Sequence, residues 1–265
     1  MNNKYIINVD KLEYIKEYRE CGINTFLFAL KDFSIGYNSY TLKQIEDIDI
    51  PNKYLLINRI LDCKDIDKLK ELLPKFKTIK GIFYEDIGII NIAKDLNLEL
   101  ILFQNHFNTN TYSVNYWLNK IDSVVISNEL TLEELTYITN NVIKPVVVHL
   151  YGHNQVMYSR RLLLSNWSNN FKIVNKNENV IEDIATHVKF RALEQEYGTV
   201  MYSDKIFNGK ELLKLNNIKY FYINPTLIDH NTVIDFINNI DKHTNELEDT
   251  GFLYKETIYK LKGAK

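Results

Sequence analysis

Two adjacent arginines lie in a stretch that is rich in aromatic and histidine side chains. The chain contains five arginines, and two of them, Arg160 and Arg161, closely follow Tyr151, His153 and Tyr158. Guanidinium groups bind carboxylates and phosphates through paired hydrogen bonds, and tyrosine rings stack on the bases of nucleic acids. We therefore predict a substrate-binding segment here. The alternative is that the two arginines are solvated or form ordinary surface ion pairs.

Acidic and histidine side chains near the ends of predicted strands could transfer protons. Glu85 follows an apolar stretch directly and is a candidate general acid or base, whereas the neighbouring Asp86 could cap the next helix. His106 could hydrogen-bond to substrate or be a packed histidine whose partner is a backbone carbonyl. Glu129 could pair with Arg161, and Arg161 is then a third candidate catalytic residue; alternatively Glu129 favours the dipole of the helix that follows it.

Several familiar catalytic and cofactor-binding motifs are missing from the sequence. It has no glycine-rich phosphate loop, no G-x-S-x-G turn and no H-E-x-x-H. Its two cysteines, Cys21 and Cys63, cannot form a zinc or iron–sulfur ligand set. His149 and His153 are four residues apart but flank a glycine and lack a third ligand. We predict no metal site and no cofactor.

Eight short apolar stretches alternate with stretches whose apolar residues recur every three or four positions. Several of the short stretches are continuously apolar, which is typical of parallel strands covered on both faces. Possible helix starts agree with this pattern, because Thr131 to Glu134 and Thr41 to Gln44 have the spacing of capping boxes. The predicted strands are Tyr5–Val9, Asn24–Ala29, Lys53–Ile57, Ile79–Tyr84, Glu99–Phe103, Ser123–Ile126, Lys144–His149 and Lys219–Ile223.

This alternation predicts an α/β fold, and the count of eight strands favours a TIM-type (β/α)8 barrel with local irregularities. About seventy residues separate the last two predicted strands, whereas one βαβ unit needs about thirty. We therefore expect a single domain over residues 1–265, with an insertion over about 151–218 that has small β elements of its own. The charged chain after Asp241 is predicted to form a final helix or an irregular end.

Composition excludes several classes of protein. A hydrophobic content of 45% with 25% charged residues excludes a disordered or collagenous chain. A net charge of −2 excludes a strong field over the whole molecule for nucleic acid, although not a local basic patch. The N-terminus lacks the apolar stretch of a signal peptide, and no segment is long enough to span a membrane. We therefore expect a cytoplasmic protein without a membrane partner.

The stretch after the seventh predicted strand resembles the signature of the peptidase U32 (collagenase-like protease) family. Gly152 takes the glycine position, and Tyr158–Arg161 with Leu163–Ser165 take most of the Tyr-Ser-x-Arg-Cys-Leu-Leu-Ser segment. Three upstream segments are similar to further family segments in the same order, so that the resemblance covers about Lys80–Trp167. These segments are Gly81–Gly88, Phe103–Asn110 and Ser127–Glu134.

The resemblance implies a barrel fold, and in the family it implies either an iron–sulfur cluster or a role in tRNA hydroxylation. Some family members hold an iron–sulfur cluster through cysteines in and beyond this motif, and others resemble or pair with subunits that hydroxylate the wobble uridine of tRNA. Here the motif glutamate position is Val147, and the two cysteine positions are Gln155 and Leu162. The resemblance therefore implies a short member that acts on tRNA together with a larger U32 paralogue, without a cluster or a thiolate nucleophile of its own.

Two alternatives remain open. The family name implies a collagenase-like peptidase or another hydrolase, which needs an activated nucleophile or a metal-bound water. A carboxylate–histidine pair at the mouth of the barrel would favour this alternative. The degraded motif also fits a catalytically silent scaffold.

Overall fold

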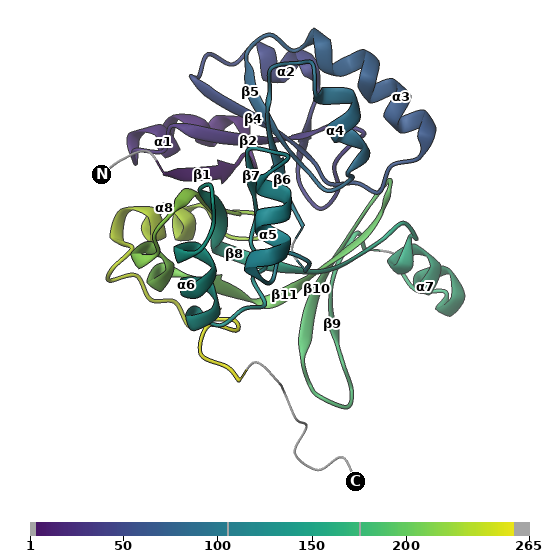
Figure 1. Ribbon diagram of the computed structural model, residues 1–265. Coiled ribbons are helices and arrows are strands. Elements are labelled where there is room, and N and C mark those ends of the chain that lie inside the picture. Colours follow the sequence, from purple (N-terminus) through teal and green to yellow (C-terminus); the bar gives the residue numbers. More distant parts are fainter. Residues whose placement is uncertain (1–3, 105, 175, 257–265) are drawn as a thin grey trace.

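The computed structural model describes residues 4–104, 106–174 and 176–256 (Figure 1). Within these residues the chain is a mixed α/β protein with eight α-helices and thirteen strands, and the strands form one sheet. No helix in the described ranges is both long enough and apolar enough to cross a membrane.

Eight strands of this sheet run parallel to one another, and all eight predicted strands are present. They pair in the order β7-β6-β5-β4-β2-β1-β12-β8. A parallel bridge between Val125 and Val147, with the Ile126 amide donating to the Val147 carbonyl at 2.9 Å, links the two ends of this path. The strands are β1 (Tyr5–Asn8), β2 (Thr25–Leu30), β4 (Asn52–Ile57), β5 (Ile79–Tyr84), β6 (Glu99–Leu102), β7 (Ser123–Val124), β8 (Val146–Ser159) and β12 (Ile218–Ile223).

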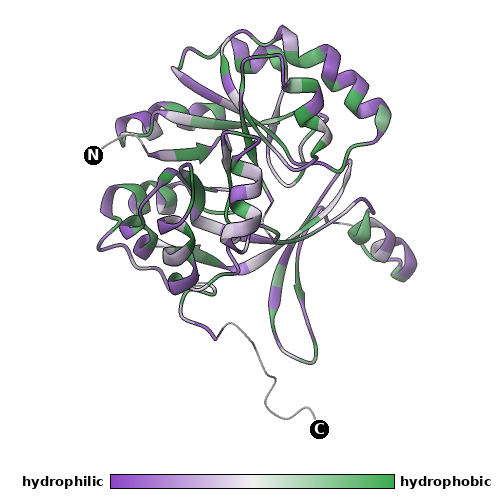
Figure 2. Ribbon diagram, in the orientation of Figure 1, coloured by the Kyte–Doolittle hydropathy of each residue, from purple (hydrophilic) through white to green (hydrophobic). Residues whose placement is uncertain are grey.

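The α-helices follow the strands, and their surfaces carry both hydrophilic and hydrophobic residues (Figure 2), as expected of helices that pack one face on a sheet. Thr41 and Gln44 form the predicted capping box of α2, and Thr131 and Glu134 form that of α6. The helices are α1 (Ile15–Glu20), α2 (Leu42–Glu46), α3 (Cys63–Leu72), α4 (Gly88–Ala93), α5 (Thr111–Leu118), α6 (Leu132–Asn140), α7 (Leu163–Phe171) and α8 (His230–Asn239).

One buried cluster lies on one face of the parallel strands. Each strand contributes to it, except that for β7 the contributing residue directly follows the strand. The alternation of side chains along a strand separates this cluster from the larger apolar layer between strands and helices. Its members are Ile6, Leu27, Ala29, Tyr37, Tyr54, Leu56, Phe83, Ile101, Phe103, Val125, Val147 and Tyr222.

The seventh strand is longer than predicted, because the predicted strand ends at His149 and β8 continues without a break to Ser159. This outer half of β8 pairs antiparallel with β11 (Gly198–Asn208), so its backbone groups are satisfied by a sheet partner. The insertion also contains α7, β9 (Glu178–Glu182) and β10 (Lys189–Gln195), and β9, β10 and β11 pair antiparallel. The prediction that the insertion has its own β elements is confirmed.

The end of the described chain has no helix after α8. Instead, the short strand β13 (Glu248–Asp249) pairs with β11. Of the two alternatives predicted for the chain after Asp241, residues 242–256 show the irregular end and not the final helix, and residues 257–265 lie outside the described ranges. Buried His243 lies 2.7 Å from a carboxylate oxygen of Glu248 and 2.5 Å from one of Asp235, which ties this segment to α8.

Candidate functional site

A layer of polar residues follows the apolar interior at the carboxyl ends of the parallel strands. Side chains that are two residues apart on a strand lie on the same face, so the residues that follow interior positions by two continue the interior. In parallel α/β folds this end of the strands is where active sites form. The layer consists of Asn8, Asn58, Glu85, Ser127, His149 and Asn224.

Three members of this layer are committed to holding loops. The Asn58 side chain accepts from the Ile35 amide and donates to the Ile35 carbonyl, both at 3.0 Å. The Asn224 side chain accepts from the Thr226 amide at 3.1 Å. Ser127 accepts from the Glu129 amide at 3.2 Å. These contacts fix the loops around the layer and leave those side chains with a structural role.

His149 is also engaged within the protein. Its Nε2 lies 3.0 Å from the Tyr151 carbonyl oxygen and its Nδ1 lies 2.9 Å from the side-chain oxygen of Asn154, and the tautomer decides which nitrogen donates. Burial lowers the pKa of His149 to about 4, although both hydrogen bonds act in the opposite direction. The ring is therefore neutral at pH 7 and does not serve as a cationic group.

The side chains of Asn8 and Glu85 are the members of the layer without hydrogen-bond partners among the described residues. Asn8 is fully buried, and neither its amide nitrogen nor its amide oxygen has a hydrogen-bond partner among the described residues. The partly buried Glu85 carboxyl likewise forms no hydrogen bond or ion pair within the described ranges. Burial raises the pKa of Glu85 to about 8. At pH 7 Glu85 is therefore mostly a neutral acid, which can donate one hydrogen bond and accept others.

Buried tyrosines surround Glu85. Burial raises the pKa of Tyr37 and that of Tyr202, and in both cases the negative charge of Glu85 contributes in the same direction. The Tyr222 hydroxyl donates to the Tyr37 hydroxyl at 3.5 Å. Among the described residues, no cation counteracts the effect of burial on the pKa of the Glu85 carboxyl.

His106 and Glu129, from the loops after β6 and β7, form a second pair at this end of the strands. The His106 Nδ1 and a Glu129 carboxylate oxygen are 3.1 Å apart, and both side chains are more than one third exposed. Glu129 has His106 as its partner, and no ion pair between Glu129 and Arg161 is present among the described residues. The sequence did place both residues at strand ends, but their contact bridges 23 positions.

The four predicted substrate-binding residues of the β8 stretch and the candidate catalytic Arg161 do not lie together in one site. Tyr151 is fully buried; its ring stacks on Phe236 at 3.8 Å and its hydroxyl donates to Glu248 at 2.7 Å. Successive side chains of a strand lie on opposite faces of the sheet. The side chains of one continuous stretch of strand therefore cannot all contact the same ligand. We leave Tyr151 out of the candidate site.

The other four residues occupy different surroundings. His153 is buried with its Nδ1 donating to the Ser203 carbonyl at 2.8 Å, and burial lowers its pKa. Tyr158 is partly buried and donates to the Tyr197 carbonyl at 3.1 Å. Arg160 and Arg161 are exposed, and neither side chain has a partner among the described residues. These two arginines remain free to contact a ligand outside the layer.

The insertion contacts the loop that carries Tyr37, and sequence reasoning missed this contact. The Gln195 side chain accepts from the Gly36 amide at 2.8 Å and donates to the Tyr37 carbonyl at 3.1 Å. The Tyr202 hydroxyl donates to the Gly36 carbonyl at 2.7 Å. Gly36 has φ +82°, and a Cβ there would lie 2.3 Å from the Tyr202 hydroxyl, so a glycine is required. No local signal marks Gln195, because its partners are about 160 residues away in the sequence.

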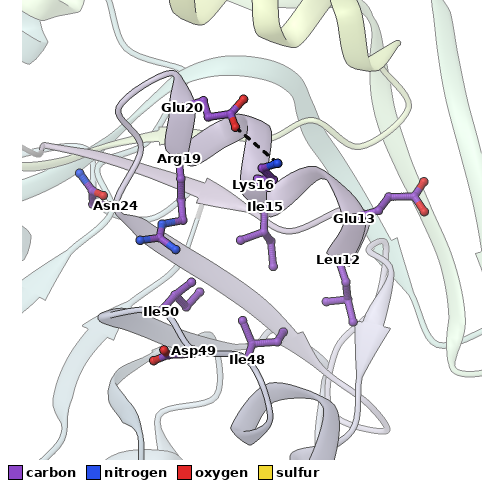
Figure 3. Close-up of a pocket in the computed structure, with 10 residues that line it drawn as sticks. All are labelled: Leu12, Glu13, Ile15, Lys16, Arg19, Glu20, Asn24, Ile48, Asp49 and Ile50. Atoms are coloured by element: carbon purple, nitrogen blue, oxygen red, sulfur yellow. Dashed lines mark ion pairs between the residues drawn. The ribbon is translucent and has the colours of Figure 1, made fainter.

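A separate groove of about 550 Å³ lies between α1 and residues 48–50 (Figure 3). Side chains of both positive and negative charge line it, and the Lys16 Nζ lies 3.9 Å from a carboxylate oxygen of Glu20. Asn24 and Ile50 place it at the amino ends of β2 and β4, away from the polar layer. In parallel α/β folds residues at this end serve stability more than catalysis.

The residues present do not fit an iron–sulfur cluster. Cys21 follows α1 and Cys63 begins α3, so the two thiols lie on different helices, and a cluster needs four ligands. In the described part of the chain, no group of three or more His, Cys, Asp or Glu side chains is placed to hold a metal ion.

A model of the peptidase family U32 matches residues 39–221. The protein belongs to this family. The match includes Glu85, the loops that carry His106 and Glu129, and the whole of β8 and α7. No curated protein matches the chain.

Two solved structures share a distant likeness with this U32 protein. The spore cortex-lytic enzyme SleL of Bacillus megaterium QM B1551 has a TM-score of 0.43 at 9% identity, over 84% of this chain and 70% of that one. A chitinase of Chromobacterium violaceum ATCC 12472 has a TM-score of 0.42 at 8% identity, over 91% of this chain and 100% of that one.

The motif residues of this U32 protein build the junction between β8 and α7. Gly152 has φ +131°, and a Cβ there would lie 2.3 Å from the Asn224 carbonyl oxygen, so β8 can approach the end of β12 only with a glycine at this position. Leu163–Ser165 form the first turn of α7. The Leu164 and Ser165 amides donate to the buried Glu194 carboxylate at 2.8 and 3.1 Å. The motif thus has a structural role here.

Proposed function

We propose that this U32 protein takes part in the hydroxylation of uridine at the wobble position of tRNA, and that its polar layer holds the base. The observation that carries the proposal is the uncommitted, neutral carboxyl of Glu85 at the carboxyl ends of the strands. A neutral carboxylic acid offers one donor and one acceptor on a single edge. Uracil presents an N–H and a carbonyl on one edge, so the two groups are complementary.

The buried amide of Asn8 supports a ligand in the same layer. A buried amide without a partner costs free energy in the unliganded protein, and such exceptions call for an explanation. A second carbonyl or N–H of a planar base would provide the missing partner. A peptide bond fits less well, because a trans amide has its N–H and its carbonyl on opposite sides.

The oxidation itself is assigned to a larger U32 paralogue. Conversion of the C5–H of uracil to C5–OH is a two-electron oxidation that requires an oxygen donor and an electron acceptor. Within the proposal, this chain binds and orients the base, and the paralogue supplies both reagents. The site of action is the cytoplasm, where tRNA is found.

We further infer that the eight parallel strands form one irregular (β/α)8 barrel and that residues 1–265 are a single domain. The bridge between Val125 and Val147 and the interior cluster drawn from every strand support this inference. The insertion then extends one side of the barrel mouth and contacts the Tyr37 loop.

Mass spectrometry of tRNA nucleosides tests the proposal. A strain without this gene is complemented with the wild type, with Glu85→Leu or with Arg19→Gln, an exposed arginine in the groove at the amino ends of the strands. We expect 5-hydroxyuridine derivatives to be restored by the wild type and Arg19→Gln, and to fall at least about tenfold with Glu85→Leu, because leucine is of similar size but has neither the donor nor the acceptor. Unchanged derivatives in the deletion strain would contradict the proposal.

A hydrolase is the second candidate, and the pair of His106 and Glu129 favours it. A carboxylate that orients a histidine makes the ring a stronger general base for a water molecule, and a neutral Glu85 could act as the general acid. His106→Asn separates the candidates: it abolishes hydrolysis of a peptide library by the purified protein if the hydrolase interpretation holds, and leaves tRNA nucleosides unchanged if the RNA interpretation holds. A silent scaffold predicts no effect of His106→Asn or Glu85→Leu in either assay.

A further inference from the structure

Positive charge is concentrated in the segment that surrounds α7. The whole chain has a net charge of −2, yet no Asp or Glu occurs between Glu134 and Glu178. The same interval contains five cations, four of them in the insertion. They are Lys144, Arg160, Arg161, Lys172 and Lys176. We call residues 160–172 the α7 arm; it begins where β8 ends, and α7 stands away from the body of the molecule (Figure 1).

Two large aromatic side chains of the α7 arm are exposed. Trp167 is 52% and Phe171 is 60% exposed, and their ring centroids are 5.6 Å apart. They are four residues apart on the helix and therefore lie on one side of it. Because large aromatic side chains bury much apolar surface when they can, an exposed pair marks a surface that awaits a partner.

The α7 arm is held in a defined position. Leu164 and Ser168 are buried beneath the helix, and the Glu194 carboxylate accepts hydrogen bonds from the first-turn amides. Glu194 is 5% exposed, and its charge is directed at the start of the helix, where it satisfies otherwise unpaired N–H groups. The aromatic pair is thus presented on a fixed element, and the acid beneath it adds no exposed negative charge.

We propose that the α7 arm binds single-stranded RNA, with Arg160, Arg161 and Lys172 contacting phosphates while Trp167 and Phe171 stack on bases. Cations and aromatic rings together are the combination that such strands require, because phosphates need positive charge and every base has a face for stacking. A polyanion fits the surface better than a protein partner does, since cations occur at both ends of the helix and residues 160–172 include no Asp or Glu. In naming RNA, the inference rests on the proposed function.

Binding of a short fluorescein-labelled oligouridylate to the purified full chain, followed by anisotropy over a salt series, tests the proposal. Three phosphate contacts predict a slope of about −2 for log K against log salt, because each contact on a single strand contributes about −0.7. Arg160→Gln and Arg161→Gln should each make the slope shallower by about 0.7. Trp167→Ala should weaken binding by about 5- to 150-fold and leave the slope unchanged.

Matched variants outside the α7 arm serve as controls. Arg19→Gln removes an exposed arginine from α1, in the groove of Figure 3. Tyr112→Ala removes an aromatic side chain that is 89% exposed on α5. Both should bind the oligonucleotide as the wild type does. All variants substitute exposed side chains, so their unfolding transitions should coincide with that of the wild type.

Three results would overturn the proposal. The first is no binding of the oligonucleotide, and the second is binding that Trp167→Ala and the arginine variants leave intact. The third is a dimer that Trp167→Ala dissociates in the absence of RNA binding, which would make the arm a protein interface. The proposed function fails separately, if Glu85→Leu restores the tRNA nucleosides, and that outcome leaves the binding result of the α7 arm in place.

Discussion

Two asparagines of the polar layer show how contacts, and not residue type, distinguish a functional candidate from a structural one. Asn8 and Asn58 both follow an interior strand residue by two positions and are fully buried. Asn58 satisfies both its amide groups with the backbone of Ile35, whereas Asn8 satisfies neither within the described residues. Asn58 therefore holds the loop, whereas the amide of Asn8 is available for a partner that the described residues do not supply.

Exchange of each asparagine for leucine should have opposite effects on stability. Asn8→Leu removes a buried amide that has no partner and should raise the free energy of unfolding by about 1 kcal/mol. Asn58→Leu leaves two backbone groups unpaired and should lower it by about 2–4 kcal/mol. Urea unfolding of both variants measures this. Destabilisation by Asn8→Leu equal to that by Asn58→Leu would show that Asn8 is satisfied inside the protein.

The carboxyl of Glu85 makes stability depend on pH. Burial raises its pKa from 4.5 to about 8, so between these values the folded protein binds a proton that the unfolded chain has released. The free energy of unfolding should therefore fall as pH rises through this window. The Glu85→Gln variant has no charge at this position, so its free energy of unfolding should lack this pH dependence. We expect it to be more stable than the wild type by about 2–4 kcal/mol at pH 9 and by little at pH 4. Denaturant unfolding across pH 4–9 checks the sign, and an equal pH dependence of both proteins would contradict it.

At the scale of elements, β8 and α7 carry the U32 motif. The motif glycine Gly152 lets β8 pass close to Asn224, and the serine of its last segment, Ser165, joins the first turn of α7 to Glu194. The motif therefore fixes the position from which the insertion leaves the parallel strands. The basic and aromatic helix α7 thereby packs on the insertion strands β10 and β11.

Removal of the Glu194 carboxylate should loosen α7 alone. Glu194→Ala leaves the first-turn amides without their acceptor, and capping groups contribute about 1–2 kcal/mol. Hydrogen exchange should speed up at least about fivefold in α7, with unchanged exchange in β4 and β5. Glu196→Ala, an exposed acid next to β10, is the control. Loss of protection across the parallel strands would show that the capping site supports the whole fold instead.

At the scale of the molecule, the parallel strands and the insertion meet at the Tyr37 loop. Gln195 binds the backbone of this loop, and the Arg59 guanidinium lies 4.0 Å from the centre of the Tyr197 ring. The insertion is thereby attached at its far end as well as at β8. Tyr37 and Tyr202, which lie near Glu85, come from the two parts that this attachment joins.

Closure of the strands into a barrel predicts slow hydrogen exchange of the Ile126 amide. Ile126 donates to Val147 at the junction of β7 and β8, and Val125 donates to Leu102 on the opposite side of the same segment. In a closed barrel both amides should exchange at least about a hundredfold more slowly than those of exposed turns. Hydrogen exchange followed by NMR measures them. A slow Val125 with a fast Ile126 would indicate an open sheet.

Local patterns in the sequence determined the strands, several helix starts and the location of Glu85 at a strand end. They could do so because side-chain alternation and capping boxes depend on residues no more than about four positions apart. The apolar stretch before Glu85 and the spacing of Thr131 and Glu134 are readable without any knowledge of the fold. The family motif was readable for the same reason.

Only the tertiary structure decided which polar groups remain available. Tyr151 is lost to the core because Phe236 packs on it, Glu129 is paired with His106, and the outer half of β8 is a strand because β11 returns to pair with it. Each of these contacts joins residues more than twenty positions apart, so no local pattern encodes it. The candidate site consists of the polar groups that have no partner once these contacts have formed. The whole fold therefore determines which residues belong to it.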